Sequence, residues 1–125
     1  VVEDSMIIAL DTEESLKRLG VASVETASGV SSALAAIAAH PPDIAIVDFN
    51  LGQESSTEVV AVLARLDVPF VLATGYAELE DKIAELGAMG IVRKPYGQSE
   101  IEDVLKTYQT LMRNPDFARS QSVSS

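Results

Sequence analysis

The chain has 125 residues, of which 47% are hydrophobic and only 5% aromatic, and its formal net charge is −10. This length allows one domain with a single core, and such a core has to be built from Val, Ile, Leu and Ala, as in sheets covered by helices on both faces. The acidic charge argues against direct nucleic-acid binding, because a phosphate backbone requires a basic surface.

Cysteine is absent, which excludes disulfides, thiol nucleophiles and thiolate metal sites and is compatible with a reducing cytoplasm. No apolar run approaches the roughly 20 residues of a membrane span, and no secretory signal pattern opens the sequence. We therefore expect a soluble, cytoplasmic chain without membrane insertion.

Short apolar runs alternate with helical patterns five times, which predicts an α/β fold with a parallel sheet wrapped by crossover helices, (βα)5. The first run is short for a central strand, so we expect the native strand to begin several residues earlier. The expected strands are residues 1–2, 22–26, 44–47, 70–73 and 90–93. The first two expected helices are residues 6–19 and 30–38. The third is opened by a Ser55/Glu58 capping box, the fourth lies around 79–86, and the fifth is opened by a Ser99/Glu102 capping box.

The end of the sequence differs in composition from the rest. Residues 114–125 are polar and rich in Ser, which is typical of a frayed tail or the start of a linker. We therefore expect one folded domain over residues 1–113, followed by this tail.

Polar side chains follow four of the five expected strands. Glu3 and Asp4 follow the first strand, Asp48 ends the third, Thr74 follows the fourth and Lys94 follows the fifth. In an open parallel sheet, ligands bind beyond the carboxyl ends of the strands. The sequence therefore predicts that these five side chains meet at one edge of the sheet.

The types of these residues suit phosphoryl transfer to a carboxylate. Clustered carboxylates repel one another, and a hard divalent cation such as Mg²⁺ relieves that repulsion. Asp48 would be the nucleophile, while Lys94 and the Thr74 hydroxyl would contact phosphoryl oxygens. Each residue alone has an ordinary explanation as a helix cap, a turn residue or a solvated charge, so the prediction depends on their joint placement.

Four motifs carry a family resemblance: VVEDS at residues 1–5, IVDFNL at 46–51, ATG at 73–75 and KP at 94–95. In this order and spacing they resemble response-regulator receiver domains, over about residues 1–111. The resemblance implies a three-layer, flavodoxin-like (CheY-like) fold with the five-stranded parallel sheet in the order 2-1-3-4-5.

The resemblance also implies a metal site. Asp48 resembles the phosphoacceptor of the family and one of its metal ligands. Asp4 resembles a direct ligand, Glu3 an outer acidic partner, and the backbone carbonyl of Asn50 a further ligand. The implied cofactor is Mg²⁺, with Mn²⁺ as a substitute.

A second set of residues resembles the switch region of the family. Thr74 matches the hydroxyl that moves towards the phosphoryl group, Lys94 the lysine that pairs with it, and Pro95 the proline that follows. Ile91 stands where receivers usually have Tyr or Phe, so the usual coupling through that aromatic ring is not expected. The ATG motif resembles a receiver subgroup, frequent in alphaproteobacteria, that lacks this aromatic ring. Tyr76 would then either take part in the switch or be a surface aromatic at the start of a helix.

The implied function is two-component phosphorelay signalling. The receiver would accept a phosphoryl group from a histidine kinase or a histidine phosphotransfer domain and switch conformation for a partner or linked output. It would not be an enzyme, beyond slow self-catalysed phosphotransfer and dephosphorylation. A free-standing regulator and the C-terminal receiver of a hybrid histidine kinase both fit, and the motifs define no oligomeric state.

Two alternatives remain open. The first is an aspartyl-phosphate phosphohydrolase, although Asn50 stands where the haloacid dehalogenase type has a second Asp as acid/base. The second is a degenerate receiver that acts as a binding module, against which the full set of Asp4, Asp48, Thr74 and Lys94 speaks.

Overall fold

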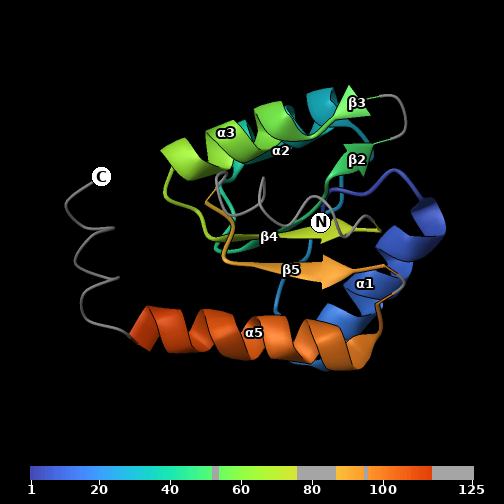
Figure 1. The fold of residues 1–125 in the computed structure, drawn as a ribbon, viewed down its shortest axis with the longest axis vertical. Coiled ribbons are helices and arrows are strands. Elements are labelled where there is room, and N and C mark those ends of the chain that lie inside the picture. Colours follow the sequence, from blue (N-terminus) through green and yellow to red (C-terminus); the bar gives the residue numbers. More distant parts are fainter. Residues whose placement is uncertain (52–53, 76–86, 95, 114–125) are drawn as a thin grey trace.

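The computed structural model describes residues 1–51, 54–75, 87–94 and 96–113 (Figure 1). The expected helix around 79–86 and the polar tail lie outside these ranges. None of the described helices is both long and apolar enough to cross a membrane. The helices are α1 (Met6–Arg18), α2 (Val30–Ala39), α3 (Thr57–Arg65) and α5 (Gln98–Arg113), and the strands are β1 (Ala45–Asp48), β2 (Asn50–Leu51), β3 (Glu54–Ser55), β4 (Phe70–Thr74) and β5 (Gly90–Arg93).

The main sheet is parallel and has β4 between β1 and β5. Val2 extends it, because this residue forms parallel bridges to both Val47 in β1 and Ala27. The backbone follows the same pattern, with Val2 N–H donating to Ile46 O at 2.8 Å and Asp48 N–H donating to Val2 O at 2.8 Å. The five chain segments therefore lie in the predicted order 2-1-3-4-5.

The second expected strand, residues 22–26, is wrong in position and extent. The bridged residue is Ala27, whose N–H donates to Val1 O at 2.9 Å. A ladder requires a neighbouring strand, and among the described residues the backbone partners of this segment are Val1 and Glu3. Pairing is therefore limited to the bridge at Ala27 and to the Val1 amino group, which donates to Glu25 O at 2.9 Å.

The sheet is covered on both faces, with α2 and α3 on one side and α1 and α5 on the other (Figure 1). Successive residues of a strand point to opposite faces, so Val47 and Leu72 pack with α2 and α3, while Ile46 packs with Leu16 and Ile101 of α1 and α5. Every residue of β1 and β4 is buried. These two strands form the buried centre of the sheet, and Asp48 and Thr74 are their last residues.

The capping box expected at Ser55 and Glu58 is wrong. The helix α3 begins at Thr57, and its N-cap residue is Ser56, whose side chain does not cap the helix. Instead the buried Ser56 Oγ–H donates to Phe49 O at 3.1 Å. Ser55 belongs to the short antiparallel pair of β2 and β3, which was not predicted from the sequence.

The capping box expected at Ser99 and Glu102 is also wrong. The helix α5 begins at Gln98, one residue before that serine. Gly97 N–H donates to Glu100 Oε2 at 2.8 Å. A carboxylate that reaches back to the start of the helix satisfies a free N–H group and opposes the positive end of the helix dipole.

Candidate functional site

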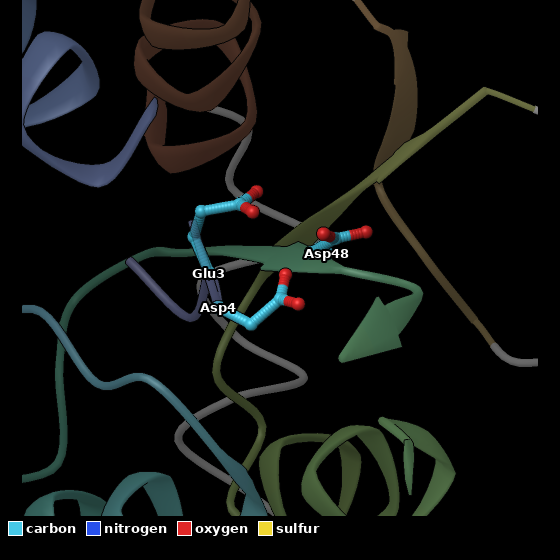
Figure 2. A group of neighbouring side chains, drawn as sticks. All are labelled: Glu3, Asp4 and Asp48. Carbon is cyan, nitrogen blue, oxygen red and sulfur yellow. The ribbon is translucent and has the colours of Figure 1, made fainter. Parts of the chain in front are cut away.

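The five predicted site residues lie at the carboxyl edge of the sheet. Asp48 and Thr74 are the last residues of β1 and β4, and Lys94 directly follows β5. Lys94 N–H donates to Thr74 O at 2.9 Å, which continues the strand pairing. Figure 2 shows the carboxyl groups of Glu3, Asp4 and Asp48 gathered beside the end of β1.

Lys94 joins two of these carboxylates. Its Nζ lies 2.6 Å from Asp48 Oδ2 and 2.8 Å from Glu3 Oε2. Glu3 and Asp48 are only 3% and 5% exposed, whereas the Lys94 side chain is 23% exposed. Buried charges of this kind are tolerated when they are paired, and removing the partner leaves a charge without compensation.

The surroundings shift the pKa values of Glu3 and Lys94. Burial raises the pKa of Glu3, against the opposing effect of its hydrogen bond to Lys94. Burial alone lowers the pKa of Lys94, but the hydrogen bonds and negative charges of Asp48 and Glu3 outweigh it, so the pKa is raised. Lys94 is therefore held as a cation at the site.

The carboxylates of Glu3, Asp4 and Asp48 fit a hard cation. One oxygen of each lies within 4.8 Å of the others, and Lys94 supplies a single positive charge against three acidic groups. Apart from the Lys94 ammonium at 2.8 Å, the buried Glu3 Oε2 has no hydrogen-bond partner among the described residues. Asp4 is exposed, which leaves room for the waters that Mg²⁺ retains.

The backbone beyond β1 orients the Asp48 carboxylate. Asn50 N–H donates to Asp48 Oδ1 at 3.2 Å, while Oδ2 faces Lys94. Asn50 lies on β2, which pairs with β3, and Asn50 is opposite Ser55. The short β2–β3 pair therefore holds Asn50, which is two positions after Asp48, in place.

The surroundings of Thr74 and of the other predicted residues differ from those of the acidic cluster. Thr74 is 3% exposed at the end of β4, beside Arg93 of β5 in the register. Ile91 is half-buried on β5 opposite Leu72 and packs against the core beneath α2 and α3. Tyr76 and Pro95 lie outside the described residues.

A further contact lies beside Lys94 and was not predicted from the sequence. The hydroxyl of Tyr96 lies 2.9 Å from Thr12 Oγ1 on α1. Thr12 is 1% exposed and lies on the apolar face of α1. A polar residue on a buried helix face needs a hydrogen-bond partner, and this was the feature of the sequence that could have predicted the contact. Nothing in the sequence around Tyr96 indicated it.

Comparison with known proteins gives the family. The family model described as "Response regulator receiver domain" matches residues 1–106. The chain therefore belongs to the response-regulator receiver domains, the phosphoacceptor modules of two-component phosphorelay signalling.

Individual relatives agree with this assignment. The "Regulatory protein VirG" of Rhizobium rhizogenes is 37% identical over 83 residues, covering 63% of this chain and 34% of that protein. The "Transcriptional regulatory protein PhoP" of Escherichia coli K12 is 31% identical over 128 residues, covering 99% of this chain and 56% of that protein. The chain thus spans about a third to a half of these relatives. The structure of chemotaxis response regulator CheY4 of Vibrio cholerae matches with a TM-score of 0.77 at 25% identity, covering 86% of this chain and 93% of CheY4.

Proposed function

We propose that Asp48 accepts a phosphoryl group from the phosphohistidine of a histidine kinase or a histidine phosphotransfer domain. An Asp48 oxygen attacks phosphorus, the P–N bond of the donor breaks, and its electron pair stays on the imidazole, which takes up a proton. The product is an acyl phosphate. The observation that carries this proposal is the contact of 2.6 Å between Lys94 Nζ and Asp48 Oδ2 within the acidic cluster.

The acidic cluster is proposed to hold Mg²⁺, or Mn²⁺ in its place. Asp4, Asp48 and the Asn50 carbonyl would be its protein ligands, and Glu3 would act from the outer side. The bound cation would neutralise charge on the phosphoryl oxygens. Three carboxylates faced by one ammonium support this proposal.

The remaining site residues are proposed to sense the phosphoryl group. Lys94 would release Asp48 Oδ2 and pair with a phosphoryl oxygen, and the Thr74 hydroxyl would donate to another. Pro95 would aim Lys94 into the site, and Tyr76 would take part in the switch. Ile91 carries no aromatic ring, so its side chain would stay packed on the core.

The domain is proposed to comprise residues 1–113, with residues 114–125 as a polar tail, and to act in the cytoplasm. It would turn over its own phosphoryl group only slowly, because Asn50 offers no carboxylate as acid/base. Signalling would then proceed through a partner or a linked output rather than through catalysis.

The experiment is phosphorylation by acetyl phosphate with Mg²⁺, followed by intact mass. We expect one phosphoryl adduct, which is lost in Asp48→Asn and suppressed by chelation of the metal. The matched control is Asp43→Asn, which removes an exposed carboxylate away from the site and should leave the adduct unchanged. An equal adduct in Asp48→Asn, or none in folded protein that also fails to bind beryllofluoride, would contradict the proposal.

A further inference from the structure

Tyr96 connects the turn after β5 to both the core and α1. It follows Lys94 by two positions, and its half-buried ring packs against two groups of buried residues beneath α1 and α5. One group is Leu16, Ile46 and Ile101, and the other is Val71, Val92 and Val104. The ring is therefore fixed, and the direction of its hydroxyl group is fixed with it.

The hydrogen bond between Tyr96 and Thr12 has a defined direction. Thr12 Oγ1–H donates to Ile8 O at 2.8 Å, and a hydroxyl has a single proton to donate. The contact of 2.9 Å must then be a donation from Tyr96 O–H to Thr12 Oγ1. A chain of two hydrogen bonds thus runs from the turn after β5 to the backbone of α1.

Few other polar contacts among the described residues tie this turn to α1. A groove of about 350 Å³ separates the two, lined on one side by Ile8, Thr12 and Ser15 and on the other by Lys94, Tyr96 and Gln98. Across it the described residues make one further hydrogen bond, the exposed contact of 3.5 Å between Arg18 and Gln98. The Tyr96 hydroxyl is therefore the main polar link across the groove among the described residues.

We propose that Tyr96 is a positioning residue, whose hydrogen bond to Thr12 holds the turn after β5 against α1 and so keeps the Lys94 ammonium at the Asp48 carboxylate. Lys94 is fixed on its amino-terminal side by the backbone bond to Thr74 O, and the Tyr96–Thr12 bond fixes the other side. Misplacing a reacting or charge-stabilising group by about 1 Å can slow a reaction by about 100-fold, so such groups have to be held to within about 0.5 Å. This inference rests on the proposed role of Asp48.

The test compares the rate of phosphorylation by acetyl phosphate at saturating Mg²⁺ in Tyr96→Phe, Thr12→Val and the double variant, with melting temperature measured alongside. We expect each single variant to lose about three- to ten-fold in maximal rate, with little change in the acetyl phosphate concentration at half-maximal rate. The double variant should lose no more than either single one, because both remove the same bond.

Two controls separate positioning from mere loss of stability. Thr12→Ser keeps the hydroxyl and should restore most of the rate, and this comparison with Thr12→Val decides the question if Tyr96→Phe does not fold. Tyr108→Phe removes a phenol on α5 near Asp43 instead of near Lys94 and should leave the rate unchanged.

The results that overturn the inference are equally specific. A wild-type rate in folded Tyr96→Phe, equal losses in Thr12→Ser and Thr12→Val, or additive losses in the double variant would each do so while the role of Asp48 stands. An unphosphorylated wild-type protein would instead remove the proposed function, and this inference with it.

Discussion

Replacing Lys94 with Met tests the electrostatics of the site directly. The substitution retains an unbranched apolar stem and removes the ammonium that lies 2.6 Å from Asp48 and 2.8 Å from Glu3. Both carboxylates are buried, so their mutual repulsion and their lost hydration would no longer be offset. We therefore expect the variant to be markedly less stable than the wild type.

The size of the effect follows from burial. Breaking a buried ion pair costs about 3–5 kcal/mol, and the 23% exposure of the Lys94 side chain places this case at the lower end, at about 3 kcal/mol. With a urea m-value of about 1.5 kcal/mol/M, the midpoint should fall by about 2 M. Added Mg²⁺ should recover part of the loss, because a cation bound to the same carboxylates replaces the missing charge.

The assay is urea unfolding followed by circular dichroism, with and without Mg²⁺. Lys106→Met is the matched control, because Lys106 pairs with Glu102 at 3.2 Å on the surface with its side chain 69% exposed, and its loss should stay within about 1 kcal/mol. Adding Asp48→Asn to Lys94→Met should restore stability by removing one of the uncompensated charges. The reasoning fails if Lys94→Met unfolds at the midpoint of Lys106→Met, or if Asp48→Asn destabilises it further.

Three further predictions concern the metal, the core and alkaline pH. Asp4→Asn should weaken Mg²⁺ binding by about ten-fold or more in calorimetric titration. The urea midpoint should not change, since Asp4 is exposed. Unchanged Mg²⁺ affinity would contradict the metal assignment. Leu63 is 0% exposed, and Leu63→Ala should lower the free energy of unfolding by about 2–5 kcal/mol. Ile7 is 76% exposed, and Ile7→Ala should change it by no more than about 0.5 kcal/mol. Similar urea midpoints for the two variants would contradict the packing. Burial raises the pKa of Tyr96, so its contribution to stability is complete below the unfolded pKa of about 10 and is lost as pH rises through the folded one. The melting temperature of Tyr96→Phe should therefore fall less steeply above that pH than the wild-type value, and parallel curves would refute this.

The sequence was sufficient for features that depend on neighbouring residues. Continuous apolar runs predicted β1, β4 and β5 to within one residue at each end, because strands covered on both faces need apolar side chains throughout. The parallel topology then placed the polar residues after these strands at one edge of the sheet, which is where the structure has Asp48, Thr74 and Lys94.

Choices among equivalent local signals were not predictable. At the start of α5 the spacing of Ser99 and Glu102 predicted a capping box, whereas in the structure Gly97 N–H donates to the carboxylate of Glu100. Ser56 Oγ–H donates to the carbonyl of Phe49, seven positions earlier, and therefore does not cap α3. These outcomes depend on which acceptor the folded chain brings within reach.

The sequence by itself determined the class of fold, the motifs of the family and the residues at the carboxyl edge. Only the tertiary structure decided that Lys94 contacts both Glu3 and Asp48, and that Tyr96 donates to Thr12. Lys94 and Asp48 are 46 positions apart in the chain, and Tyr96 and Thr12 are 84 apart. Hydrogen bonds and ion pairs require heavy atoms to approach to about 3 Å, and between such distant residues only the packing of the strands and helices determines that approach.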